Sequence, residues 1–199
     1  NMEINLQKLT GEWNAGYALD VHTTSSKPIK DEEGKVIKFE NTYSEIGELM
    51  NRLKYRGEQQ LATKIAEVAD SHMRQYLKTW QIDIIIPIPP SKLDRPFQPV
   101  LEIAKAFSKI VNLPIDLNGL RKTRATPQMI GINDADERRR ILQGVFDVSQ
   151  NAYTGKNILL IDDLFRSGAT LNAATKVLQN KGNARGVYVL TITKTRVHR

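Results

Sequence analysis

Apolar residues change their spacing along the first 80 residues, and this change predicts two kinds of structure. Residues 11–22 have the pattern of a strand, a polar turn is predicted at residues 23–27, and a second strand follows near residues 36–39. Beyond these, apolar residues recur at three- and four-residue steps. This spacing predicts two helices separated by Gly57, the second over about residues 58–80.

From residue 82 onwards, predicted strands and helices alternate. Residues 82–88 are a nearly unbroken run of β-branched residues, typical of a strand buried on both faces of a parallel sheet, and residues 157–161 are predicted as a second central strand. The remaining predicted elements are strands at residues 144–148 and 186–193 and helices at residues 99–111 and 169–178. The pattern predicts an α/β fold, with a parallel sheet flanked by helices and right-handed crossovers. We expect a small, hood-like β-rich lobe over residues 1–43 and an α/β domain over residues 44–199.

Composition excludes several kinds of chemistry. The chain has no cysteine, which excludes disulfides, cysteine nucleophiles and thiolate metal sites. Its three histidines are far apart in sequence, so no metal site is expected from protein side chains alone. No apolar run approaches the roughly 20 residues needed to span a bilayer, and the first residues lack a signal-peptide pattern. We therefore expect a cytoplasmic protein without a membrane segment.

The net charge of +7 fits either nucleic acid or a polyanionic small molecule as partner. Basic residues gather at Arg121, Lys122 and Arg124, and again at residues 138–140. We interpret residues 138–140 as the solvated face of a helix. No aromatic RNA-binding motif or helix-turn-helix pattern is apparent, so nucleic acid is not the favoured partner.

One segment, residues 158–171, combines a buried strand with polar groups at its carboxyl end. Asp162 and Asp163 follow the apolar run directly, at the edge where ligands of open α/β sheets bind. Adjacent carboxylates are strong acceptors, which suits a vicinal diol such as the 2′- and 3′-hydroxyls of a ribose.

The residues after the acid pair suit a phosphate. Ser167 and Thr170 supply hydroxyls, Gly168 lets a ligand approach the backbone, and the N–H groups of residues 166–170 open a helix whose positive end favours anions. The alternative is that Asp163 or Ser167 only caps this helix. A cap needs one such residue and this turn has several, so we favour a sugar-phosphate site.

This segment resembles the phosphoribosyl pyrophosphate (PRPP) motif of type I phosphoribosyltransferases. More narrowly, the chain resembles the ComF-like branch of that superfamily over about residues 53–195. Residues 54–57 match its Lys-Tyr-x-Gly signature, although a helix end closed by glycine would read the same way. Residues 137–146 resemble its arginine-containing segment. The chain departs from the family at Arg166, where threonine or serine is usual.

The resemblance implies roles for four groups of residues. It assigns the ribose to Asp162 and Asp163, and the 5′-phosphate to Arg166, Ser167, Gly168, Ala169 and Thr170. It assigns pyrophosphate to the turn Pro89, Pro90, Ser91 and Lys92, and a flexible loop to Arg121, Lys122, Arg124 and Gln128. Mg²⁺ is expected to bind mainly through PRPP, with Asp162 or Asp163 as the protein ligand.

The resemblance implies a phosphoribosyltransferase that uses PRPP and Mg²⁺, releases pyrophosphate and acts on an unidentified acceptor, expected to be a nitrogenous base. The alternative is a non-catalytic PRPP-sensing or nucleic-acid-associated protein of the competence type. The sequence leaves a homodimer open and offers no general base.

Overall fold

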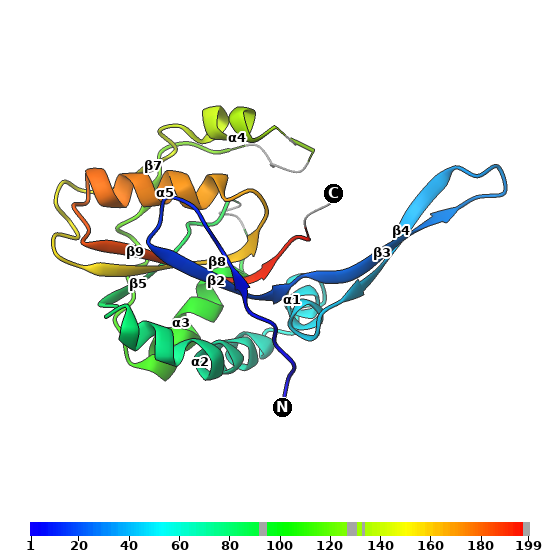
Figure 1. Cartoon of the computed structure of the whole chain (residues 1–199), viewed down its shortest axis with the longest axis horizontal. Helices are drawn as coiled ribbons and strands as arrows, with labels where there is room; N and C mark the ends of the chain where they lie inside the picture. The colour runs from blue at the N-terminus through cyan, green and yellow to red at the C-terminus, as the bar shows by residue number, and fades with distance from the viewer. Residues whose placement is uncertain (92–94, 127–130, 133, 197–199) are drawn as a thin grey trace.

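The computed structural model describes residues 1–91, 95–126, 131–132 and 134–196. Its centre is a five-stranded sheet with the strand order β1-β2-β9-β8-β5, in which every neighbouring pair is parallel except β1 and β2 (Figure 1). The five strands are β1 (Gln7–Lys8), β2 (Ala15–Val21), β5 (Ile84–Pro87), β8 (Asn157–Phe165) and β9 (Gly186–Lys194).

Helices cover both faces of this sheet (Figure 1). One face carries α1 (Glu45–Tyr55), α2 (Leu61–Thr79) and α3 (Pro99–Val111), and the other carries α4 (Ala135–Leu142) and α5 (Ala169–Asn180). The expected α/β class, with a mainly parallel sheet flanked by helices, is therefore confirmed.

Strand β8 is buried on both faces of the sheet, between the two layers of helices. Leu159 and Ile161 pack with the core on the α1–α3 face, whereas Ile158 and Leu160 pack with the core on the α5 face. All four side chains are fully buried, and burial of each contributes about 1.5–3 kcal/mol. Because apolar side chains are needed on both faces, the strand has no polar alternation until it reaches the carboxyl edge of the sheet.

The strands of the N-terminal segment belong to two different sheets, which the sequence pattern did not predict. The strand predicted within residues 11–22 is β2, and it joins the large sheet beside β9. The turn predicted at residues 23–27 is wrong, because these residues lie in strand β3 (Thr23–Lys30), which pairs with β4 (Val36–Tyr43) in a separate hairpin. Sequence periodicity missed β3 because most of its residues are polar and exposed, so no apolar alternation marks it.

The β3–β4 hairpin projects from the body of the molecule (Figure 1). Its turn lies at residues 31–34, where Gly34 adopts a positive φ of 82° and donates to the Asp31 carbonyl. The division into a lobe over residues 1–43 and a domain over residues 44–199 stays a prediction.

A second two-stranded sheet pairs β6 (Arg121–Lys122) with β7 (Phe146–Asp147) in antiparallel register. It brings the basic segment after residue 120 close to the end of β5, where Lys122 contacts Ser91. None of the helices in the described part of the chain is long and apolar enough to cross a membrane.

Candidate functional site

The carboxyl ends of β5 and β8 open into a cavity of about 350 Å³. The cavity brings together segments that are far apart in sequence: the end of α1, the turn after β5, β6, α4 and the start of α5. The predicted site residues that line it are Pro89, Pro90, Ser91, Lys122, Asp162, Asp163, Arg166, Ser167, Gly168, Ala169 and Thr170.

Two predicted site residues in the described ranges, Arg121 and Arg124, do not line this cavity. Arg121 forms an ion pair of 3.4 Å with Asp147, and Arg124 donates to the carbonyls of residues 141 and 143. Successive side chains of a strand point to opposite faces, so Lys122 faces the cavity while Arg121 faces away. Lys92 and Gln128 lie outside the described residues.

The acid pair at the end of β8 is held by a lysine from α1. Lys54 Nζ lies 2.9 Å from Asp163 Oδ2, and about three quarters of each side chain is buried. Asp162 accepts a 2.8 Å hydrogen bond from the Asp163 backbone N–H. The Lys-Tyr-x-Gly signature at residues 54–57 therefore has a second role besides closing α1, because its lysine forms an ion pair with the acid pair.

These contacts make the two carboxylates unequal. Burial alone would raise the pKa of Asp163, but the charge and hydrogen bond of Lys54 outweigh it and hold that pKa below its ordinary value. Burial and the neighbouring Asp163 carboxylate raise the pKa of Asp162 well above its ordinary value. Asp163 is therefore a fixed anion, whereas Asp162 gains most from a ligand that donates hydrogen bonds or carries a cation.

The turn after the acid pair presents its backbone to the cavity. Gly168 is the N-cap of α5 and has a φ of 82°, in the left-handed region that favours glycine. A Cβ at this position would lie 3.1 Å from the Phe165 ring, which is itself packed edge-on against Trp13. Glycine is thus required both by the backbone conformation and by the close packing under the turn.

The alternative interpretation, in which Asp163 or Ser167 only caps α5, is met only in part. Because the N-cap residue is glycine, it provides no side-chain acceptor for the first turn of α5. Ser167 Oγ accepts one long hydrogen bond, 3.4 Å, from the Ala169 N–H. A helix start with N–H groups facing a cavity is a favourable place for an anion.

Arg138 lies at this turn, and sequence reasoning missed it. Its side chain is buried, donates to Ser167 Oγ over 3.3 Å and also contacts the Ile132 carbonyl. The interpretation of residues 138–140 as a solvated face holds for Arg139 and Arg140 but is wrong for Arg138. The available signal was helical spacing: Arg138 precedes the buried Leu142 by four residues, so both share the inward face of α4.

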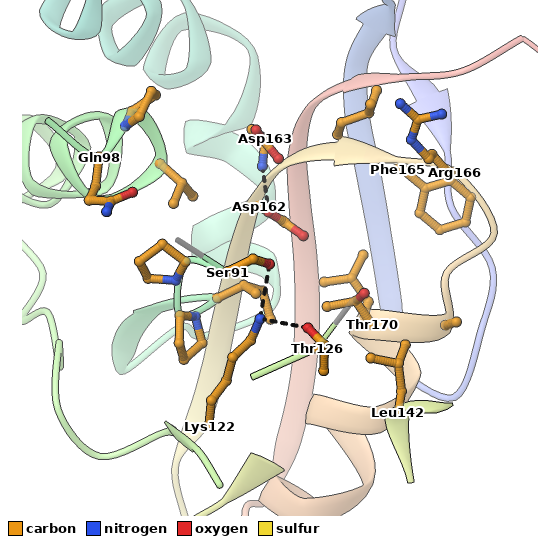
Figure 2. Close-up of a pocket in the computed structure, with 18 of the residues that line it drawn as sticks. Ser91, Gln98, Lys122, Thr126, Leu142, Asp162, Asp163, Phe165, Arg166 and Thr170 are labelled. Atoms are coloured by element: carbon orange, nitrogen blue, oxygen red, sulfur yellow. Dashed lines mark hydrogen bonds between the residues drawn. The ribbon is translucent and has the colours of Figure 1, made fainter. Parts of the chain in front are cut away.

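A second basic group enters from β6. Lys122 Nζ donates to Ser91 Oγ over 3.0 Å and to Thr126 Oγ1 over 3.5 Å, which ties the turn after β5 to the segment after β6 (Figure 2). Burial lowers the pKa of Lys122, although the carboxylate of Asp162 opposes this shift. The lysine is therefore partly desolvated and ready to pair with an incoming anion.

Arg166 is exposed at the cavity, as are Ser91 and Ser167. Figure 2 shows its guanidinium and the Lys122 ammonium at opposite ends of the site, with the Asp162 carboxylate between them. The cavity thus has cations at two separated positions and carboxylates in the middle, a distribution that matches a sugar carrying anionic groups at both ends.

Within the described ranges, no group of three or more histidine, cysteine, aspartate or glutamate residues is arranged to hold a metal ion. The acid pair nevertheless fits Mg²⁺, which binds through one or two carboxylates and keeps its remaining positions for water and substrate phosphates. Asp162 is the residue suited to this, because Asp163 is already paired with Lys54.

Comparison with known proteins gives distant relatives. The chain is 27% identical over 165 residues to competence protein ComFC of Bacillus subtilis, covering 77% of this chain and 62% of that protein. It is 25% identical over 142 residues to competence protein F of Haemophilus influenzae, covering 67% of this chain and 62% of that protein. The chain therefore spans about 62% of the length of these curated relatives. The predicted resemblance to ComF-like proteins is confirmed as distant homology.

No protein-family model matches the chain. Among solved structures, an adenine phosphoribosyltransferase superposes with a TM-score of 0.47 and 12% identity, covering 86% of each chain. With this TM-score and this sequence identity, the superposition supports no statement about the function of the chain.

Proposed function

We propose that this protein binds PRPP with Mg²⁺ and transfers its phosphoribosyl group to an acceptor, with release of pyrophosphate. One observation carries the proposal: the Asp162–Asp163 pair and the glycine turn that opens α5 line the same cavity. Acceptors for a diol therefore lie beside donors for a phosphate, at the edge of the sheet where α/β proteins bind nucleotides.

The acid pair is suited to hold the ribose. Lys54 fixes Asp163 as a charged acceptor, and Asp162 stands next to it with its carboxylate facing the cavity. Each hydrogen bond from a ribose hydroxyl to a carboxylate contributes about 1.5–3 kcal/mol. With the ribose bound to the acid pair, the adjacent turn at residues 166–170 is suited to the 5′-phosphate. Arg138 holds Ser167 of this turn in place by a hydrogen bond.

The opposite end of the cavity is suited to pyrophosphate. Ser91 and Lys122 lie together at that end, and Pro89, Pro90 and Arg95 from the segment after β5 also line the cavity. Breaking the bond at C1 of PRPP places negative charge on the leaving pyrophosphate, so cations at this end stabilise the transition state. Lys92 and Gln128 stay predicted members of this region, and the flexible-loop role of Arg121 and Arg124 stays a prediction.

Mg²⁺ would be held by oxygen atoms of PRPP together with Asp162. When bound, the cation supplies charge neutralisation for the leaving group. The chain's own part is to orient the ribose through the acid pair, to place basic groups at both ends, and to keep water from C1. We assign no general base among the described cavity residues, so the proton of the attacking nitrogen would pass to the released pyrophosphate.

A second candidate is PRPP binding without turnover. It is favoured by the names of both relatives, which are competence proteins, and by the net charge of +7. In that case PRPP would bind as a signal, and the remaining basic surface would contact nucleic acid.

The two candidates are separated by measuring pyrophosphate release from PRPP and Mg²⁺ with a panel of purine and pyrimidine bases. We expect release that depends on one class of base and disappears in Asp162→Asn, but persists in Arg139→Met, whose side chain is exposed outside the cavity. PRPP binding without release, together with a salt-sensitive shift of single-stranded DNA, would favour the second candidate. Failure to bind PRPP at all would overturn both.

A further inference from the structure

The β3–β4 hairpin exposes apolar side chains that nothing in the described structure covers. The exposed fractions are 42% for Val36, 61% for Ile37 and 61% for Phe39, all on β4. The hairpin extends well away from the body of the molecule (Figure 1). A two-stranded hairpin is marginally stable by itself, and exposed large apolar side chains at its surface indicate a binding partner.

The two edges of this hairpin are unequal. Strand β3 contains Pro28, which has no N–H to donate, and one register shift leaves its Thr24 without a partner on β4. A second shift leaves Ile37 of β4 without a partner on β3, whereas residues 38–42 of β4 pair one to one with residues 25–29. Strand β4 contains neither proline nor glycine, and residues 36–42 are all exposed. Proline and bulges protect an edge from pairing, whereas a regular edge offers a row of N–H and carbonyl groups. The β4 edge has no proline and a continuous register over residues 38–42, so it is the edge better able to accept another strand.

We propose that β4 pairs antiparallel with β4 of a second copy of this chain, with Phe39 on the two-fold axis. In that register Phe39 faces its own copy, Lys38 faces Glu40 of the second copy, and Glu40 faces Lys38. Directly opposed side chains lie about 4.5–5.5 Å apart, so both ion pairs and the contact between aromatic rings form together. The result is a four-stranded sheet that joins two protomers.

Symmetry leaves few alternatives to this register. When two copies of one strand pair edge to edge about a two-fold axis, one residue must face itself. Shifting the axis to Lys38 places two lysines opposite each other, and shifting it to Glu40 places two glutamates opposite each other, which is destabilising. Only the axis at Phe39 gives opposite charges on both sides and keeps the contact near the centre of Val36–Tyr43.

The charge of the hairpin supports a second copy as partner. Residues 23–43 contain four lysines and four acidic residues, so this segment is neutral although the chain carries +7. Two copies therefore approach here without net repulsion, and a polyanion such as nucleic acid gains little at this surface. This inference does not depend on the proposed reaction, because the hairpin residues do not line the cavity.

The charge pairing provides a first test. By sedimentation or light scattering, we expect the intact chain to form a dimer of twice 22.5 kDa as its concentration rises. Lys38→Glu should weaken this dimer because two glutamates then face each other, and Glu40→Lys should weaken it because two lysines do. An equimolar mixture of the two variants should form the dimer again, since each copy then presents charges that complement the other. Recovery in the mixture also shows that both variants are folded.

A cross-link tests the register. Because the chain has no cysteine, Phe39→Cys introduces its only thiol, and this thiol lies on the proposed axis. Facing residues of antiparallel strands have Cα atoms about 4.5–5.5 Å apart, within reach of a disulfide. Oxygen with a copper catalyst removes two electrons and two protons from the facing thiols and should link the copies. In the matched control Asn41→Cys, the thiols are separated by four residues along the strand, about 13 Å, and should not link.

Two results would overturn the proposal. One is a chain that stays monomeric at every concentration and gives no disulfide through Cys introduced at position 39. The other is a dimer that persists equally in Lys38→Glu and Glu40→Lys, or that links through position 41 as readily as through position 39.

Discussion

Lys54 Nζ lies 2.9 Å from Asp163 Oδ2, although the two residues are more than a hundred positions apart and come from α1 and β8. This pair joins the helical layer to the carboxyl edge of the sheet. It also gives the two adjacent aspartates different environments, because Lys54 forms its ion pair with Asp163.

The pair should stabilise the fold. We expect Lys54→Met to lower the free energy of unfolding, and a double-mutant cycle with Asp163→Asn to give a coupling of about 1–2 kcal/mol. The coupling can be measured by urea denaturation. Since the pKa of Asp163 is held low, this contribution is present above the ordinary aspartate pKa and is lost as the pH falls through the lowered value.

A matched control is the Glu102–Lys105 pair on α3, where roughly two fifths of each side chain is exposed. The same cycle there should give a coupling of less than about 0.5 kcal/mol. Equal coupling energies for the two pairs would contradict the claim that burial makes the Lys54–Asp163 pair the stronger one.

We expect the charged Asp162 side chain to lower the free energy of unfolding, although it contributes to PRPP binding. Its raised pKa means that the charged form is disfavoured in the folded state, so stability is lost as the pH rises through that pKa. Asp162→Asn should therefore raise the melting temperature at pH 7, by about 2–4 °C for each kcal/mol relieved. The gain should vanish at acidic pH, where the wild-type carboxyl is protonated. A lower melting temperature at pH 7 would show instead that the carboxylate is structural.

We expect Arg138 to contribute more to PRPP binding than Arg139 does. Arg138→Met removes a donor to Ser167 at the turn, worth about 0.5–1.5 kcal/mol, and should weaken PRPP binding by about 2- to 10-fold. Arg139→Met removes a charge from the same helix, but that side chain is 72% exposed and pairs with Asp136. Calorimetric titration with PRPP should show little change for Arg139→Met. Equal losses in both variants would indicate a general effect of positive charge.

A hydrogen bond outside the cavity gives a pH-dependent prediction. The buried Tyr153 hydroxyl donates to Asp116 Oδ2 over 2.8 Å, and this bond with two backbone N–H groups holds the pKa of Asp116 below its ordinary value, although burial opposes the shift. Tyr153→Phe should cost about 1–2 kcal/mol of unfolding free energy at pH 7. This difference should shrink as the pH falls through the lowered pKa of Asp116, because a protonated carboxyl accepts more weakly.

The control for this effect is Tyr55→Phe, because the Tyr55 side chain is largely exposed. Its stability should match that of the wild type at every pH. A Tyr153→Phe difference that stays constant down to strongly acidic pH would contradict the role of Asp116.

The central strands and the turn after them could be predicted from sequence because local rules decide them. A run buried on both faces must be apolar, as in β8, and a positive φ beside a packed ring requires Gly168. The positions of Asp162 and Asp163 then follow from where the apolar run ends.

What the sequence could not supply depends on contacts between distant segments. Nothing local to Lys54 indicates Asp163, and among the three consecutive arginines only the four-residue spacing from Leu142 marks Arg138 as the inward one. Strand β2 was predicted, but its place beside β9 depends on the burial of Ala18 and Leu19 on opposite faces of the large sheet. Strand β3 was missed because an exposed hairpin needs no apolar face, so the pattern used to detect strands is absent there.

The central claim is that the acid pair holds the ribose of PRPP, and calorimetric titration of Asp162→Asn/Asp163→Asn with PRPP and Mg²⁺ tests it most directly. The matched control is Glu32→Gln/Glu33→Gln, which removes two adjacent, exposed carboxylates from the hairpin turn and changes the net charge equally. We predict at least a tenfold loss of PRPP affinity in the aspartate variant, and wild-type affinity in the control, with both proteins folded by thermal melting. Unchanged PRPP affinity in a folded Asp162→Asn/Asp163→Asn protein would contradict the assignment of this site.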